Sequence, residues 1–163
     1  MRFTNNPSPS FLDRFHDVRQ ILNKFNEYYL ENYTPSWISC LDELMNSFME
    51  KFCPGFLSVP RKPHPLGNEC HSIADGDEGY PVMYRIKIQE GKDRPKDANG
   101  KWAFPSKFEG ENPYTWRKYT KTSSLMYDMT VSIHDTGNTV SPDSVLCVTV
   151  GILHLHEHGV YGQ

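Results

Sequence analysis

The spacing of apolar side chains changes along the chain, and this change constrains the fold more than any other feature of the sequence. Between residues 11 and 33 apolar side chains recur every three or four positions, which is typical of an amphipathic helix that stops before Pro35. Between residues 80 and 89 they alternate with polar ones, as in a half-buried strand. A chain with both periods is predicted to form an α/β fold, with a mixed sheet covered by helices.

Further elements are expected on both sides of this strand. Residues 37–41 are aromatic and β-branched, and predict a buried strand that ends at Asp42. Residues 53–67 hold four prolines and two glycines and must be irregular, and the polar residues 90–118 predict a long loop or insertion. The remaining elements are expected to be a strand at 69–74, a helix at 122–134, a strand at 138–143 and a helix at 145–158.

The length and composition suit one domain. A chain of 163 residues with 37% hydrophobic content can bury one ordinary core. Residues 1–10 contain two prolines and are expected to be a flexible lead-in. Residues 11–163 are expected to be the domain itself, with its helix at 11–33, three strands within 36–89, and a helix-strand-helix unit in 119–163.

The charge and the cysteines restrict the class of protein. A net charge of −3 gives no general attraction to phosphate, so any contact with DNA must be local. The four cysteines form no CxxC pair and no apolar signal segment precedes them, which favours reduced thiols inside a cell. No stretch is apolar enough to predict a membrane span.

Two aspartates are candidates for metal chemistry. Asp42 is placed at the end of one expected strand and Asp143 at the end of another. If these strands are neighbours, the carboxylates converge, and hard divalent ions such as Mg²⁺ prefer such oxygen ligands. On spacing alone, a turn or helix-cap role for each aspartate is the more common interpretation.

Ordered sequence blocks resemble those of piggyBac-type DDE transposases over nearly the whole chain. The blocks read PSWISCLDELM at 35–45, CPGF at 53–56, VPRKPHPLGNECHSIAD at 59–75, EGKDRP at 90–95, KTSSLM at 121–126, TGNTVSPDSVLCV at 136–148, and GVYGQ at 159–163. The resemblance implies an RNase H-like fold, and an activity of DNA strand cleavage and joining at transposon ends that depends on Mg²⁺ or Mn²⁺.

The resemblance also assigns roles to single residues. Asp42 matches the first catalytic acid of the family and Asp143 the second, so both are expected to be catalytic and to bind the metal. The third acid of the family is expected downstream of Gln163. The chain is therefore expected to be a fragment that is incomplete at its C-terminus and has no cleavage activity of its own.

The sequence departs from the family pattern close to the second acid. Ser141 and Pro142 stand where apolar strand residues are usual. Proline has no N–H to donate and is poorly tolerated in a central strand. Pro142 is therefore expected to disturb the position of Asp143 relative to Asp42.

Basic residues outside the acids are candidates for binding DNA. Arg61 and Lys62 lie in a proline-rich run that could place cations on a phosphate, and Lys92 and Arg94 could join the same surface. A solvated loop is the plainer interpretation of this composition. Among the acids, Glu43 is expected to face away from Asp42, because successive strand side chains point to opposite faces.

The sequence also allows other interpretations. His154 and His158 lie four residues apart, but an exposed polar helix end explains them better than a metal site. A non-catalytic module that binds DNA or protein, and a decayed gene copy without a role, both compete with the transposase fragment. The family resemblance further implies a nuclear location, and a homodimer for full-length relatives.

Overall fold

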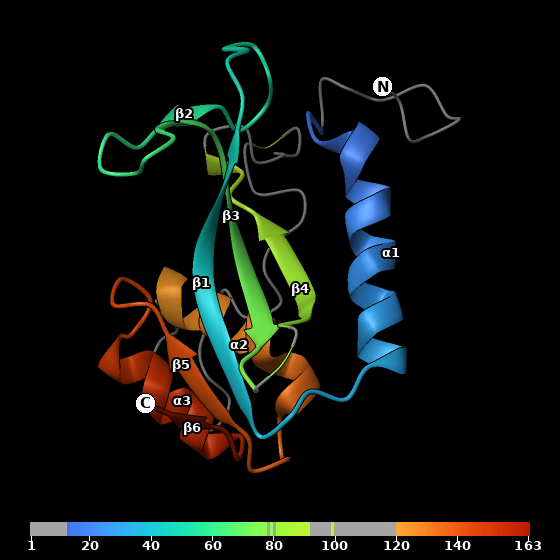
Figure 1. Ribbon diagram of the computed structural model, residues 1–163, viewed down its shortest axis with the longest axis vertical. Helices are drawn as coiled ribbons and strands as arrows, with labels where there is room; N and C mark the ends of the chain where they lie inside the picture. The colour runs from blue at the N-terminus through green and yellow to red at the C-terminus, as the bar shows by residue number, and fades with distance from the viewer. Residues whose placement is uncertain (1–12, 78, 80, 92–98, 100–119) are drawn as a thin grey trace.

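A computed structural model describes residues 13–77, 79, 81–91, 99 and 120–163 (Figure 1). The predicted lead-in at 1–10 and most of the loop expected at 90–118, including Lys92 and Arg94, lie outside the described residues. No helix within the described ranges is long and apolar enough to cross a membrane.

The chain forms a mixed sheet with helices around it. In chain order the elements are α1 (His16–Asn32), β1 (Ile38–Ser47), β2 (Leu57–Ser58), β3 (Leu66–Asp75), β4 (Met83–Ile88), α2 (Lys121–Thr130), a 3₁₀ turn (Val131–Ile133), β5 (Thr139–Pro142), α3 (Thr149–Glu157) and β6 (Tyr161–Gly162). The strand order is β2-β3-β1-β5-β6, and β4 also pairs with β3. The predicted α/β class with a mixed sheet is confirmed.

The pairing of β1 determines the centre of the sheet. It is antiparallel to β3 and parallel to β5. Along β1, Ser39 and Leu41 are buried while Cys40 and Asp42 are exposed. In this part of β1, one face of the strand therefore packs into the protein and the opposite face is exposed to solvent.

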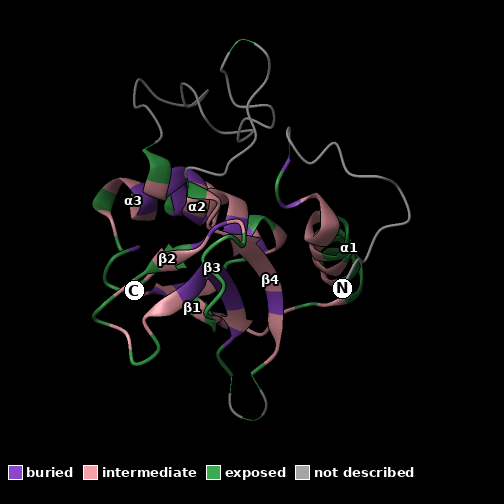
Figure 2. Ribbon diagram, turned by 90° about the horizontal axis from the view of Figure 1, so that it is seen from above, coloured by how far each residue is buried: buried purple, intermediate pink, exposed green. Residues whose placement is uncertain are grey.

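The core lies between the sheet and the helices α2 and α3. Figure 2 shows these two helices together on one side of the sheet, with α1 apart from them beside β4. The fully buried apolar side chains of the core come from strands and helices alike: Leu41, Ile73, Met126, Met129, Ile133, Val140, Leu155 and Val160.

Helix α1 covers the edge strand β4. The side-chain amide of Asn26 donates to the carbonyl of Ile86 at 2.9 Å, and its oxygen accepts from the Ile86 N–H at 2.9 Å. An edge strand with free N–H and C=O groups invites pairing with other chains. The asparagine therefore replaces a neighbouring strand at this position.

Two expected boundaries are wrong in ways that affect the site. Strand β1 does not end at Asp42 but continues to Ser47, because β3 pairs with it as far as the Ser47–Gly67 register. The last helix begins at Thr149 instead of 145, because residues 143–147 form a turn in which the N–H groups of Leu146 and Cys147 donate to the Asp143 carbonyl at 2.8 Å. The irregular segment 53–67 also contains β2 and the start of β3.

Candidate active site between β1 and β5

The parallel pairing of β1 and β5 places Asp42 and Asp143 at the same level of the sheet. The register runs from Ile38–Thr139 to Leu41–Pro142, and the Asp143 N–H extends it by donating to the Leu41 carbonyl at 2.8 Å. Register partners in parallel strands point to the same face. The next pair is Asp42 and Asp143, on the face opposite to the buried Leu41.

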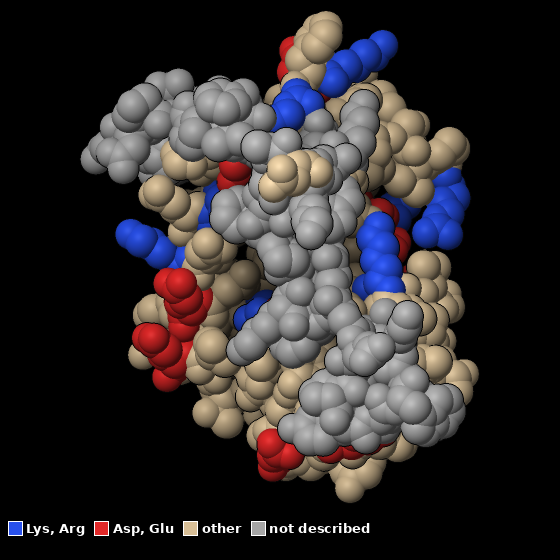
Figure 3. Space-filling view, turned by 180° about the vertical axis from the view of Figure 1, so that it is seen from behind, with Lys and Arg blue, Asp and Glu red and all other residues tan. Residues whose placement is uncertain are grey.

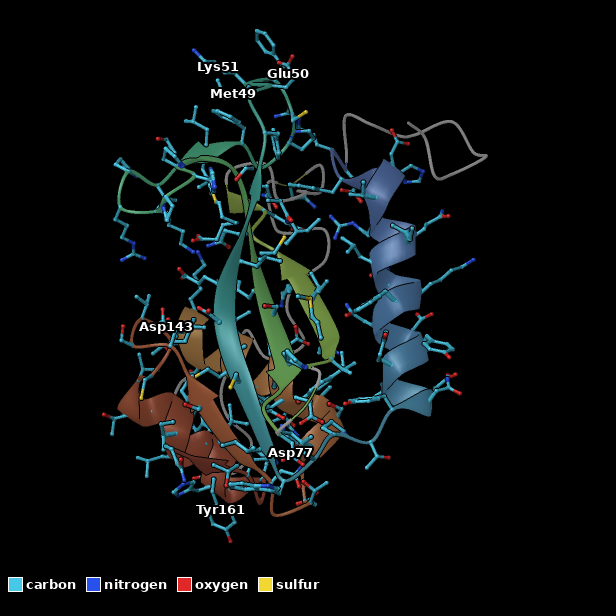
Figure 4. The ribbon with its side chains drawn as sticks, in the orientation of Figure 1. Met49, Glu50, Lys51, Asp77, Asp143 and Tyr161 are labelled. Carbon is cyan, nitrogen blue, oxygen red and sulfur yellow. The ribbon has the colours of Figure 1, made fainter. Side chains whose placement is uncertain are left out.

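Both carboxylates are accessible to solvent and each accepts local hydrogen bonds. Asp42 Oδ1 accepts from the Glu43 N–H at 2.6 Å. Asp143 Oδ1 accepts from the Ser144 N–H at 2.6 Å and from the Ser144 hydroxyl at 3.2 Å. Figure 4 shows Asp143 beside the middle of β1, in the turn that follows β5. Local bonds therefore orient one oxygen of each carboxylate.

Pro142 does not displace Asp143. In β5 the N–H groups of Thr139 and Asp143 point to β1 and donate to Trp37 and Leu41 at 2.8 Å. Because N–H directions alternate along a strand, the nitrogen of Pro142 points to the other neighbour, β6. The register between β5 and β6 pairs Thr139 with Tyr161 and Val140 with Gly162, so it ends before Pro142. The proline thus removes no hydrogen bond between β1 and β5.

Glu43 lies on the other face of β1, as the alternation of strand side chains predicts. Its carboxylate is 3.5 Å from the Arg61 guanidinium and 3.6 Å from the Lys62 ammonium. It therefore belongs to an ion-pair cluster behind the sheet and does not share a face with Asp42.

The basic residues named from the sequence have different surroundings. The Arg61 side chain is 64% exposed, whereas that of Lys62 is 20% exposed and contacts Glu43 and Glu69. Arg85 and Lys87, farther along the chain, both pair with Asp128 of α2. Figure 3, a view from behind, shows Lys and Arg side chains in separate places with Asp and Glu among them.

His154 and His158 do not lie on an exposed polar helix end, although the sequence predicts one. His154 is not on an exposed helix end: it is 0% exposed, since α3 turns this side into the core. His158 stacks on His134 with ring centroids 4.9 Å apart, and Tyr127 packs edge-on against both rings. Burial, with a smaller contribution from His158, lowers the pKa of His134 to about 4. The sequence contains no signal for this cluster, because its members come from separate elements.

The donor set for a metal is small. Within the described residues, no group of three or more histidine, cysteine, aspartate or glutamate side chains is placed to hold an ion. Two carboxylates are nevertheless the kind of donor through which proteins commonly bind Mg²⁺ or Mn²⁺, while water fills the remaining positions.

Comparison with known families decides the relationship. The family described as "Transposase IS4" matches residues 1–162. The chain belongs to this family. No curated protein matches the sequence significantly.

A solved structure supports the same assignment at the level of the fold. The chain is similar to one described as "Cryo-EM structure of piggyBac transposase synaptic complex with hairpin DNA", with 17% identity and a TM-score of 0.70. The similarity covers 97% of this chain and 29% of that one, so this chain spans less than a third of the length of the transposase. The predicted resemblance to piggyBac-type transposases is confirmed, and the mixed α/β sheet matches a transposase fold.

Proposed function

We propose that this transposase-family chain carries part of a metal-dependent DNA-processing site, in which Asp42 and Asp143 bind one divalent ion. The observation that carries the proposal is the hydrogen bond from the Asp143 N–H to the Leu41 carbonyl at 2.8 Å, which keeps β5 in register with β1 up to the two acids. A shift of one residue would turn Asp143 to the buried face.

The chemistry of the two residues suits Mg²⁺ or Mn²⁺. Carboxylate oxygens are hard ligands, and both groups are open to the water that such an ion retains. When bound, the ion would supply positive charge for a phosphate oxygen and acidify a water molecule. The protein's own contribution is to hold the two carboxylates, through Glu43 and Ser144, facing the same region of solvent.

DNA is the partner that we propose for this chain. Arg61 is the best placed of the described candidates, because its guanidinium is exposed and can contact a phosphate while it pairs loosely with Glu43 at 3.5 Å. Lys92 and Arg94 are proposed on the resemblance alone. A DNA partner also favours the nuclear location expected from the family, and the pairing of two copies stays a prediction.

A titration with Mn²⁺ tests the metal site. Because Mn²⁺ is paramagnetic, its binding broadens the NMR signals of nearby amides, and we expect selective loss of the signals of Asp42 and Asp143. Asp42→Asn and Asp143→Asn should each weaken binding by about tenfold or more, because each removes a charged ligand. The matched control is Glu31→Gln, which removes an exposed carboxylate on α1, far from β5. Equal broadening in all four proteins would refute the proposal.

A further inference from the structure

A lysine on the back of the sheet contacts the residue that follows Asp42. Lys62 lies in the turn between β2 and β3, which is closed by hydrogen bonds from the Val59 N–H to Pro65 and from the Lys62 N–H to Val59. Its ammonium donates to the Glu43 carbonyl at 3.0 Å. The turn therefore reaches across β3 and is bound to β1 next to the first acid.

The same ammonium also neutralises two carboxylates. It is 3.6 Å from Glu43 Oε2 and 3.6 Å from Glu69 Oε1, and the side chains of these glutamates are 9% and 12% exposed. Largely buried carboxylates repel one another unless a cation lies between them. An ammonium has three donors, and three oxygens already surround this one, so it has little capacity left for a phosphate.

The backbone N–H and carbonyl of Glu43 connect this cluster to Asp42. The Glu43 carbonyl accepts from Lys62 on the back of the sheet, and the Glu43 N–H donates to Asp42 Oδ1 at 2.6 Å. Rotation of β1 at Glu43 would therefore break the bond to the lysine and turn the Asp42 carboxylate away from Asp143.

We propose that Lys62 is a positioning residue, which fixes the Glu43 backbone and through it the Asp42 carboxylate for metal binding. The inference rests on the proposed metal site, and it gives Lys62 a role different from the DNA contact suggested by its sequence. The DNA contact remains assigned to Arg61, its exposed neighbour. The two adjacent cations, which both pair with Glu43, thus have different proposed roles.

The test compares Lys62→Met, which keeps the length of the side chain without its charge, with Lys62→Arg and with Arg61→Met. Arg61→Met is the matched control, because Arg61 also pairs with Glu43 but is mostly exposed. In the Mn²⁺ titration, Lys62→Met should bind about tenfold more weakly. Lys62→Arg should restore most of the affinity, and Arg61→Met should not change it.

A second readout works without metal. Hydrogen exchange of the Glu43 amide should become about tenfold faster in Lys62→Met, while the amides of Met129 and Leu155 in the core keep their rates. If Lys62→Met does not fold, the double variant Lys62→Met, Glu69→Gln is used instead, because the second substitution removes one of the two carboxylates that repel each other. An unchanged Glu43 exchange rate or an unchanged Mn²⁺ affinity in the folded variant would overturn the role of Lys62. If the unmodified chain does not bind Mn²⁺ but the Glu43 amide still exchanges faster in Lys62→Met, the metal site is refuted.

Discussion

Asp75 shows how a single carboxylate holds two distant segments together. It is buried at the end of β3 and accepts hydrogen bonds from the Ser36 N–H at 2.8 Å, the Ser36 hydroxyl, the Tyr33 hydroxyl at 2.9 Å and the Asp77 N–H at 3.1 Å. Burial alone would raise its pKa, but these donors, Ser36 above all, lower the pKa to about 2. The connection from α1 to β1 is thereby anchored to β3.

Replacing Asp75 should therefore destabilise the fold in a pH-dependent way. Since the folded-state pKa is below the ordinary value of 3.8, the contribution of Asp75 is present above that value and is lost as the pH falls toward 2. Asp75→Asn should lower the free energy of unfolding by about 2 kcal/mol at pH 7. It should also reduce the loss of stability between pH 4 and 2. Urea unfolding at several pH values measures both, and a pH profile identical to that of the unmodified chain would contradict the assignment.

At the scale of single residues, the sequence could suggest the acids but not their surroundings. Asp42 and Asp143 are visible as acids near apolar runs. The partners of Lys62 and of Asp75 are not, because Glu43 and Tyr33 meet them only after folding. Sequence spacing carries no information on such contacts.

Among the elements, a half-buried histidine packs against both α2 and the end of α3. His134, after the 3₁₀ turn, stacks on His158 at the end of α3. The charges nearest to it are His158, which opposes protonation, and Asp135, which favours it, and Tyr127 and Thr130 of α2 are its other neighbours. Because burial lowers the folded-state pKa to about 4, the packing favours the neutral ring.

This packing predicts acid sensitivity of the α2–α3 contact. A histidine that is harder to protonate when folded contributes stability above its ordinary pKa of 6.5, and that stability declines as the pH falls from 6.5 to about 4. In His134→Gln, the free energy of unfolding lost between pH 6.5 and 4 should be smaller by roughly 2 kcal/mol. This value allows for solvent screening of the partly exposed ring. Thermal unfolding between pH 7 and 4 measures the slope; His156→Gln, on the exposed side of α3, is the control. An equally steep decline in His134→Gln would refute the role.

How much of each element could be predicted depends on whether local or distant contacts form it. The spacing of apolar residues predicts α1 and β4, because their patterns are local. The second half of β1 could not be predicted, because residues 42–47 gain their strand conformation from pairing with β3. The proline in β5 was expected to disturb the site, and only the alternation of hydrogen bonds explains why it does not.

For the whole molecule, we propose that the chain carries part of a catalytic site. Among the described residues, no group of three or more metal-ligating side chains is placed to hold an ion, whereas two-metal phosphoryl chemistry requires a fuller set of ligands. We therefore predict that the 163-residue chain does not cleave a transposon-end duplex in the presence of Mg²⁺. A gel assay with labelled DNA measures this. Efficient nicking that is abolished by Asp42→Ala would show that two aspartates suffice.

Anomalous diffraction from crystals of the chain soaked in Mn²⁺ would show whether β1 and β5 hold Asp42 and Asp143 around one metal ion. We predict one strong anomalous peak in contact with both carboxylates, which disappears in Asp143→Asn. A peak elsewhere on the surface, or side chains of Asp42 and Asp143 on opposite faces of the sheet, would contradict it.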